Sequence, residues 1–469
     1  MKSILAFDFG ASTGRAIKAA YDGEKIEYSE VHRFDNTPLI IDGHIHHNVE
    51  MIISEIKKAI GKAGNIDSLA FDTWGVDYAL LDKEGNIITP PYHYRDKRTE
   101  TALENAKDKI SLDMLYQFTG NQIMSINTLF QLLCDSNMSK ADKMLFMPDL
   151  FSYLLCGNPV CEKTIASTSQ MINPITRAFS DEVLNTFNIR KELFAPLIDS
   201  STVCGEYNGI KVISVAGHDT QCAVAAMPSN ECGAAFLSCG TWSLIGCELE
   251  EPILTKESNA LELSNELGAN GKINYLKNIS GLWLIQETRR DLAMNGESFT
   301  YNELEQLARK AEPFKCFIDP DSPMLSSHGN LPDKIKNYCR QTNQYIPETV
   351  GDTVRCIYES LALKYRLAIE QISQCTEKSF SVLHMLGGGT KDGFRCQMTA
   401  DSINLPVIAG PTEATALGNI MLQLIALGEI NNVKDGRRLI AQSEALKKYI
   451  PRHNDEWEKA YKKFKEIIF

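Results

Sequence analysis

One pattern recurs in the two halves of this 469-residue chain: a short apolar stretch that runs into glycine and hydroxyl residues. The first copy is residues 5–13, and residues 234–241 echo it in the second half. An internal repeat predicts two copies of one structural unit. The length agrees, because a single hydrophobic core rarely serves more than about 300 residues. We therefore expect two domains, residues 1–226 and residues 227–469.

Local patterns predict that strands and helices alternate, which indicates an α/β fold. Apolar runs predict strands at residues 3–9, 68–74, 212–215, 234–241, 382–386 and 405–409. Helical spacing of apolar residues predicts four helices. The first is capped by Asn48 and stopped by Gly61 and Gly64, and the second begins at Asp352. The third runs from Thr412 to Gly428, and the last is an amphipathic helix at the C-terminal end.

Composition excludes several classes of function. The formal net charge is −12 and the pI is about 5.4, which argue against nucleic-acid binding and against docking on an anionic membrane. The 13 cysteines are scattered and form no CxxC pair, so we expect buried free thiols and no structural zinc. No signal peptide is evident and no apolar run approaches the ~20 residues that span a bilayer. We expect a cytoplasmic protein.

Two glycine- and hydroxyl-containing loops are candidate phosphate sites. In the first, Asp8 closes a strand and residues 10–15 follow, with small residues that let backbone amides approach phosphate oxygens and with Arg15 for charge. Residues 238–243 hold the corresponding place in the second half. An ordinary hairpin turn explains either loop alone, whereas two such loops in one chain favour a phosphate clamp supplied by two domains.

A third loop, Gly387-Gly388-Gly389-Thr390, follows a predicted strand and allows close approach by a flat ring or a ribose. Asp392 stands where a GxGxxG fingerprint needs glycine, and no GxxxxGK[ST] occurs in the chain. A tight strand-to-helix turn is the alternative explanation, and it accounts for one glycine more easily than for three.

A candidate general base is Asp219, which follows a predicted strand in Ala216-Gly217-His218-Asp219-Thr220. A carboxylate at the C-terminal end of a strand is well placed for a cleft and could take a proton from a sugar hydroxyl. Alternatively, Asp219 caps a helix that begins near Gln221. The two roles are compatible.

Aromatic and histidine residues give two further candidates. Asp72-Thr73-Trp74-Gly75-Val76-Asp77 could stack a sugar on Trp74 and bind its hydroxyls through carboxylates, or could be a buried strand end. His44, His46 and His47 are loosely spaced and have no carboxylate or cysteine close by in sequence. We interpret these histidines as a polar loop and not as a metal site.

Taken together and in this order, these motifs resemble the FGGY family of carbohydrate kinases. The resemblance runs from Ile4 to about Lys434. The segments that carry it are residues 7–12, 72–77, 94–96, 147–153, 217–220, 238–244, 278–283 and 407–414. It implies two ribonuclease-H-like domains, as in actin and hexokinase, with sugar and ATP in an interdomain cleft. Residues 1–226 would form the sugar and phosphate side and residues 227–469 the nucleotide side.

The resemblance also implies roles for single residues. Asp219 would be the base that takes the proton from O1 of the sugar, and Asp8 would lie near Mg²⁺. The substrate would be contacted by Gly75, His218, Asp219, Thr220 and Asn278. ATP would be held by Ala11, Ser12, Thr13, Gly14, Arg15, Thr241, Gln286 and Gly388. The run from Thr390 to Phe394 departs from the family pattern, in which an asparagine follows the glycines.

The implied reaction is transfer of the ATP γ-phosphoryl group to O1 of L-rhamnulose, in L-rhamnose catabolism, with Mg²⁺ as cofactor. Another ketose such as L-fuculose or L-xylulose is the alternative substrate. An alternative of a different class is a non-catalytic sugar or nucleotide sensor on the same fold, which would need no base at the sugar. The implied partners are a small sugar and ATP, and the resemblance specifies no oligomeric state.

Overall fold

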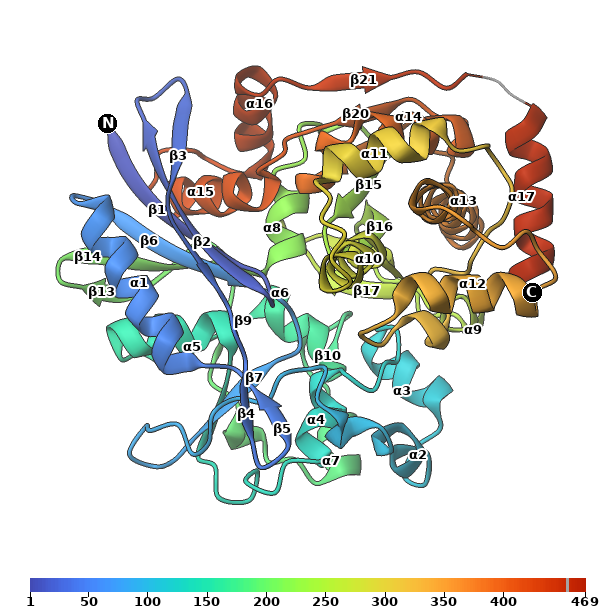
Figure 1. The fold of residues 1–469 in the computed structure, drawn as a ribbon. Coiled ribbons are helices and arrows are strands. Elements are labelled where there is room, and N and C mark those ends of the chain that lie inside the picture. Colours follow the sequence, from blue (N-terminus) through green and yellow to red (C-terminus); the bar gives the residue numbers. More distant parts are fainter. Residues whose placement is uncertain (453–454) are drawn as a thin grey trace. The chain divides into compact units, whose positions relative to one another are not determined.

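The computed structural model describes residues 1–452 and 455–469, and the chain divides into two compact units (Figure 1). The first unit comprises Met1–Ser229, Glu248–Tyr275 and Ala414–Ser443. The second comprises Asn230–Cys247, Leu276–Glu413 and Glu444–Phe469. The domain boundary between residues 226 and 227 stays a prediction. No helix in the described part of the chain is both long and apolar enough to cross a membrane.

The first unit is built on a six-stranded sheet in the order β13-β14-β6-β1-β2-β3. Strand β1 pairs antiparallel with β2 and parallel with β6, which in turn pairs parallel with β14. The bounds are β1 Lys2–Phe9, β2 Thr13–Tyr21, β3 Ile26–Asp35, β6 Ser68–Thr73, β13 Thr202–Tyr207 and β14 Ile210–His218. The strands predicted at residues 3–9 and 68–74 are confirmed.

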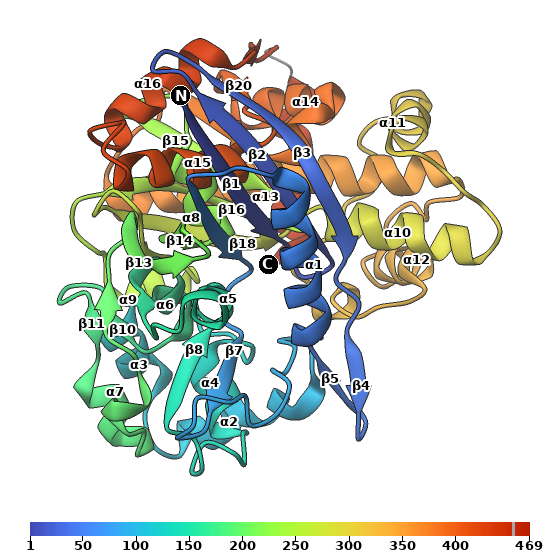
Figure 2. The ribbon, with the colours of Figure 1, turned by 90° about the vertical axis from the view of Figure 1, so that its left-hand side faces the viewer.

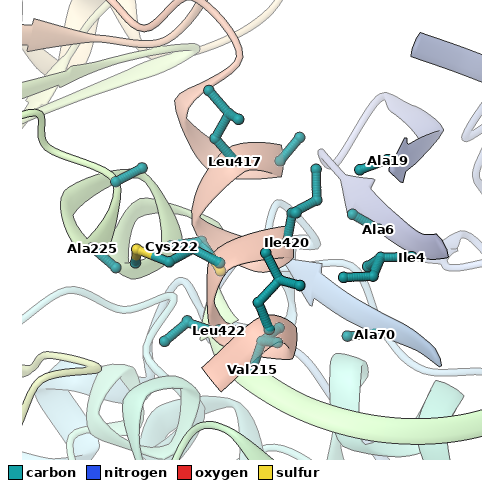
Figure 3. Close-up of a cluster of buried hydrophobic side chains, with 14 of the residues drawn as sticks. Ile4, Ala6, Ala19, Ala70, Val215, Cys222, Ala225, Leu417, Ile420 and Leu422 are labelled. Atoms are coloured by element: carbon teal, nitrogen blue, oxygen red, sulfur yellow. The ribbon is translucent and has the colours of Figure 1, made fainter. Parts of the chain in front are cut away.

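Alternation along the strands gives this sheet two different faces. Ile4 and Ala6 of β1 belong to an apolar cluster with helix α15 (Ala414–Ala426), where Figure 3 shows Ile420 next to them. Phe7 and Phe9 alternate with these residues and contact a separate aromatic group that includes Phe71 and Phe151. Asp8 therefore lies on the same face of the sheet as α15.

Helix α1 (Val49–Ala63) lies beside β3 in both views (Figures 1 and 2). Asn48 caps it, as predicted, by accepting a hydrogen bond from the Met51 amide. Gly64 ends the helix with φ of 66°, but the prediction that Gly61 stops it is wrong, because Gly61 lies inside α1. Glycine lowers helix stability without forcing a break.

Shorter elements complete the first unit. Its other helices are α2 Ala102–Lys107, α3 Leu112–Thr119, α4 Thr128–Leu133, α5 Met147–Cys156, α6 Lys163–Ala166, α7 Asp181–Phe187, α8 Asp219–Ala225, α9 Lys256–Ala260 and α16 Val433–Ser443. Its other strands are β4 Leu39–Ile41, β5 His44–His46, β7 Tyr78–Leu81, β8 Lys143–Phe146, β9 Cys161–Glu162, β10 Ile172–Asn173, β11 Ala178–Phe179, β12 Leu197–Ile198 and β17 Ser264–Leu267.

The sheet of the second unit repeats the same order of strand directions. Neighbouring strands follow in the order β18-β16-β15-β19-β20-β21, and β15 pairs antiparallel with β16 and parallel with β19. Strand β20 pairs parallel with β19 and antiparallel with β21, as β14 does with β6 and β13. The bounds are β15 Ala234–Cys239, β16 Trp242–Leu249, β18 Ile273–Ser280, β19 Val382–Leu386, β20 Val407–Ala409 and β21 Lys447–Tyr449. The predicted repeat of one α/β unit is confirmed.

The helices of the second unit are α10 Trp283–Met294, α11 Tyr301–Lys310, α12 Leu331–Gln341, α13 Val350–Thr376, α14 Gly393–Ile403 and α17 Asp455–Ile468. Helix α13 begins two residues before the predicted Asp352, whose carboxylate closes a capping box with Thr349. Helix α17 buries Trp457, Tyr461 and Phe464 on one face, as its amphipathic pattern predicts.

Candidate functional site

The hairpin between β1 and β2 carries the predicted phosphate residues Ala11 to Arg15. The Gly10 amide donates to the Thr13 carbonyl at 2.9 Å, which closes a tight turn. Ser12 and Thr13 are exposed at its tip, while Arg15, opposite Asp8 in the register, forms an ion pair with the Asp8 carboxylate. The loop is a hairpin turn, which was the alternative explanation, and it also presents hydroxyls and a guanidinium.

Two carboxylates lie side by side where β1 and β6 end. The parallel register pairs Asp8 with Asp72, and neighbouring strands lie about 4.8 Å apart. Burial raises the pKa of Asp72 well above its usual value, and the Asp8 carboxylate raises it further. Oδ1 of Asp72 is buried without a hydrogen-bond partner among the described atoms. This edge of the sheet therefore holds a concentration of acidic oxygen atoms that is incompletely neutralised by protein groups.

Helix α15 holds Asp72 in place through a hydrogen bond. Asn419 donates from Nδ2 to Oδ2 of Asp72 at 2.7 Å. One turn later, Gln423 accepts a hydrogen bond from the Ser68 hydroxyl at 2.7 Å and donates one to the Leu5 carbonyl at 3.1 Å. Side chains four residues apart share a helix face, so α15 presents a polar ladder to the strands that bear the two acids.

Asp219 stands at the junction between β14 and α8. It is the first residue of α8, and His218 occupies the cap position. The prediction that Asp219 caps a helix starting near Gln221 is therefore wrong. The helix begins two residues earlier, and Oδ1 of Asp219 instead accepts a hydrogen bond from the Thr220 amide at 2.5 Å. The side chain keeps 34% of its surface exposed, so the carboxylate is accessible to a ligand.

The charge state of Asp219 depends on its neighbours. Burial raises the pKa of its carboxyl group, the nearby His218 lowers it, and Asp8 raises it again; the net direction is upward. A carboxylate with a raised pKa is a better proton acceptor than an ordinary aspartate. Position and electrostatics thus both suit a general base.

His218 connects Asp219 to a residue that sequence reasoning missed. Its Nε2 lies 3.5 Å from Oδ1 of Asp219, and its Nδ1 lies 3.0 Å from Oε2 of Glu266 on β17. Glu266 also accepts a hydrogen bond from Gln221 at 2.7 Å. Burial alone would lower the pKa of His218, but Glu266 and Asp219 outweigh burial and raise it. Glu266 therefore orients the imidazole and favours its protonated form.

Asp77 organises the segment around Gly75. Its carboxylate accepts hydrogen bonds from Trp74 Nε1 at 2.9 Å and from Gln131 Nε2 at 2.9 Å, and lies 2.6 Å from His47 Nε2. Trp74 and Asp77 are both buried, so the idea that a sugar stacks on Trp74 between two carboxylates is wrong. The buried-strand-end alternative holds, and only the half-buried Gly75 faces outward.

The residue after Gly75 has an unusual backbone. Val76 has φ of 67°, in the left-handed region that a β-branched residue rarely adopts. Two hydrogen bonds hold this backbone in place. The Val76 amide donates to the Thr168 hydroxyl at 3.1 Å, and the Val76 carbonyl accepts from the Thr128 hydroxyl at 2.7 Å. Backbone strain of this kind gathers at functional segments, which agrees with a role for Gly75.

The prediction that His44, His46 and His47 lie in a loop is wrong. His44 and His46 lie in strand β5, and His46 and His47 are buried. His44 pairs with Asp96 at 3.0 Å and His47 with Asp77. These carboxylates are 52 and 30 residues away in the chain, so local sequence could not reveal them.

In the second unit, the turn between β15 and β16 meets the beginning of α10. The Leu282 amide donates to the Gly240 carbonyl at 3.0 Å, and the Trp283 amide donates to the Thr241 carbonyl at 3.0 Å. The Thr241 hydroxyl lies 3.3 Å from Oε1 of Gln286. The structure thus brings two predicted ATP residues together, and Thr241 is exposed.

The three glycines after β19 serve different purposes. A Cβ on Gly389 would lie 2.5 Å from Sγ of Cys239, and Gly387 has φ of 85°, so packing and backbone conformation explain both. Gly388 is exposed, and a Cβ there would meet nothing within 4 Å. The tight-turn explanation therefore accounts for two of the glycines but gives no reason for Gly388.

The remaining predicted substrate residues fall in different units. Gly75, His218, Asp219 and Thr220 belong to the first unit, where the last three follow one another at the start of α8. Asn278 lies on the part of β18 that belongs to the second unit.

Comparisons with known proteins cover nearly the whole chain. The family model described as "FGGY family of carbohydrate kinases, N-terminal domain" matches residues 3–236, and that of the C-terminal domain matches residues 235–427. A rhamnulokinase of Bacteroides thetaiotaomicron is 39% identical, with 100% of this chain and 99% of the relative covered. The rhamnulokinases of Lactiplantibacillus plantarum (97% and 96% covered) and Bacillus subtilis (96% of both chains covered) are 37% and 36% identical.

Solved structures resemble the fold at much lower identity. A ligand-bound xylulose kinase from Lactobacillus acidophilus superposes with a TM-score of 0.80 at 17% identity, covering 100% of this chain and 98% of the other. A gluconate kinase from the same organism gives 0.79 at 17% identity, covering 99% and 97%. These likenesses confirm the predicted fold of two actin- and hexokinase-like α/β domains.

Proposed function

Because the chain belongs to the FGGY family of carbohydrate kinases, we propose that it transfers the γ-phosphoryl group of ATP to O1 of L-rhamnulose. The products are L-rhamnulose 1-phosphate and ADP. The observation that carries the choice of sugar is the set of curated relatives named rhamnulokinase, which match this chain at 36–39% identity over nearly their full lengths. The 13 cysteines are all free thiols, which suits a reducing cytoplasm.

In this proposal Asp219 takes the proton from the O1 hydroxyl as that oxygen attacks the γ-phosphorus in line. The exposed third of its side chain and its raised pKa support the role. His218 and Thr220 flank the reacting oxygen, and Glu266 fixes the ring of His218. Gly75 and Asn278 complete the sugar contacts. The base is thus held by neighbours that orient it without blocking it.

The phosphates and the adenosine are held by other residues. Ala11, Ser12, Thr13, Gly14 and Arg15 supply amides, hydroxyls and a positive charge from the first unit, as phosphate binding requires. Thr241, Gln286 and Gly388 act on the nucleotide from the second unit. The open space at Gly388 supports close approach by a ligand at that position.

Asp8 is the residue that we propose to hold Mg²⁺, with Asp72 beside it. The acidic oxygen atoms at this edge, including the unpartnered Oδ1 of Asp72, suit a hard cation that prefers oxygen ligands. When bound, the ion supplies neutralisation of phosphate charge. Arg15 already contacts Asp8, so the carboxylate is oriented before any ligand arrives.

A coupled assay for ADP release with a panel of ketoses tests the proposal. We expect the highest kcat/KM with L-rhamnulose. A pocket that buries its terminal methyl group gains about 1–3 kcal/mol over a ketose that lacks one, such as L-xylulose, whereas L-fuculose shares the methyl group and must be discriminated by the configuration of its hydroxyl groups. A higher kcat/KM with L-fuculose or L-xylulose would contradict the choice of L-rhamnulose as substrate, and only the family assignment would remain. A rate of ADP release that is the same with and without each sugar would instead favour a sensor on the same fold.

A further inference from the structure

Three cysteines that are far apart in sequence meet in the interior of the second unit. Cys316 follows α11, Cys339 lies on α12 and Cys356 lies on α13. Their Sγ atoms all lie within 4.8 Å of one another, and all three residues are buried. They are the only group of three or more potential metal-binding side chains that meets this distance within residues 1–452 and 455–469.

The backbone around Cys316 is held rigidly by its neighbours. The Phe317 amide donates to Oε1 of Gln344 at 2.8 Å, and Nε2 of Gln344 donates back to the Phe317 carbonyl at 2.8 Å. The Ile318 amide donates to the Ser360 hydroxyl of α13 at 2.9 Å. The three sulfur atoms therefore sit on elements that are already fixed in place, as a preformed metal site requires.

The three thiols hydrogen-bond to one another. Thiolate, not thiol, is the metal ligand, so a bound cation would replace the protons of these thiol groups.

Beside the cluster is a cavity of about 10 Å³, lined in part by Cys316 and Cys356. That is about the space that one water molecule or a small ion needs. Lys315 and Arg355 also line it, but they pair with Glu312 at 2.8 Å and with Glu359 at 2.5 Å, and Asp352 is a further lining residue. The case for a metal site therefore rests on the geometry of the three sulfur atoms and on the space beside them.

We propose that Cys316, Cys339 and Cys356 form a binding site for a thiophilic cation of the zinc type. Three Zn–S bonds of about 2.3 Å in tetrahedral geometry place the sulfur atoms about 3.8 Å apart, so only a small contraction is needed. Binding of Zn²⁺ to the three thiols breaks three S–H bonds, forms three Zn–S bonds and releases three protons to solvent. The cavity leaves the fourth position to water.

The proposal differs from the expectation that the chain holds no structural zinc. The expectation rested on the lack of CxxC spacing, whereas these ligands come from three separate elements. The bound ion would tie α12, α13 and the segment after α11 together. The proposal is independent of the reaction, because it concerns none of the residues placed at sugar or ATP.

The test uses the full chain, purified without metal and kept reduced by a phosphine. We expect it to bind about one Zn²⁺ per chain, to protect these three cysteines from alkylation in peptide mass spectrometry, and to give intense sulfur-to-metal bands with Co²⁺. Cys339→Ser should bind Zn²⁺ at least about tenfold more weakly. Cys204→Ser, a buried cysteine outside the cluster, should bind as the parent does.

Three outcomes would overturn the proposal: less than stoichiometric binding by the reduced chain, a disulfide joining two of these cysteines in the protein as first isolated, or full Zn²⁺ affinity in Cys339→Ser. If that variant fails to fold, the Co²⁺ spectrum of the unaltered chain decides, because weak bands without sulfur-to-metal character exclude thiolate ligands.

Discussion

The two sheets of this protein share one strand order but end in different chemistry. In each unit a strand enters a glycine turn, pairs antiparallel with the next strand, and pairs parallel with a strand from later in the chain. A glycine amide closes each turn, with Gly10 donating to the carbonyl of Thr13, three residues on, at 2.9 Å and Gly240 donating to the carbonyl of Trp242, two residues on, at 3.0 Å. The backbone frame is therefore duplicated.

The side chains at the strand ends are not duplicated. Two residues before its glycine, the first unit has Asp8, whose parallel neighbour is Asp72. At the same place the second unit has Ser238, whose neighbour is Leu386. Acidic groups that could serve proton and metal chemistry thus gather in one unit, while the other offers hydroxyl and glycine residues suited to close approach by a nucleotide. One scaffold supports both, because the strand ends tolerate different residues.

The largest expected effect tests the acidic side of this comparison. In Asp219→Asn the amide keeps the size and can still accept the Thr220 hydrogen bond, but it cannot take a proton. We expect kcat to fall by roughly 10²–10⁴ while the thermal midpoint stays close to that of the parent. Sugar affinity, measured by calorimetry, should weaken less than kcat.

Asp8→Asn is the matched control for that experiment. It alters the carboxylate proposed for Mg²⁺, so raised Mg²⁺ should partly restore its rate and should not restore that of Asp219→Asn. A nearly normal kcat in a folded Asp219→Asn protein would show that Asp219 is not the general base. The proposed catalytic role of the acidic groups in the first unit would then lack support.

The next effect tests the glycine side. Gly389→Ala places a Cβ against Cys239 and Arg395, and overpacking of a buried site costs typically about 1–3 kcal/mol of unfolding free energy. Gly388→Ala meets nothing and should leave stability unchanged while raising the KM for ATP about tenfold, or ~1.4 kcal/mol. Denaturant unfolding and steady-state kinetics on both variants separate packing from nucleotide contact. An unchanged KM in Gly388→Ala would leave that glycine without a functional reason.

Sequence alone predicted the parts of the fold and site whose signals are local. Asn48 caps its helix because side chain and amide are three residues apart, and β1 and β6 follow from short apolar runs. The pairing of Asn419 with Asp72 joins residues 347 positions apart, and no periodicity in either segment indicates it.

Distance along the chain also explains why the sequence did not indicate Glu266. It lies in a short strand of four buried residues, three of them polar, which has no apolar pattern to mark it. Its partner His218 is 48 positions earlier. The predicted base and its neighbours were accessible because they form one continuous motif, whereas the group that orients them is placed by the tertiary fold.

The smallest expected effect concerns that orienting group. Glu266→Gln keeps an acceptor for His218 but removes the negative charge. The pKa of His218, followed by NMR, should fall, because Glu266 is the main influence that raises it against burial. A modest rise in the KM for sugar is expected, with kcat less affected, since Asp219 itself is unchanged.

The negative charge of Glu266 should also contribute to the unfolding free energy, and this contribution should depend on pH. The folded-state pKa of His218 is raised, so its stabilising contribution is complete below the ordinary histidine pKa and is lost as pH rises through the raised value. The unfolding free energy of the parent should therefore exceed that of Glu266→Gln most in mildly acidic buffer, and the difference should shrink toward alkaline pH. A difference that stays constant across this range would mean that Glu266 acts on His218 through packing and not through charge, and an unmoved pKa of His218 would show that the contact is absent in solution.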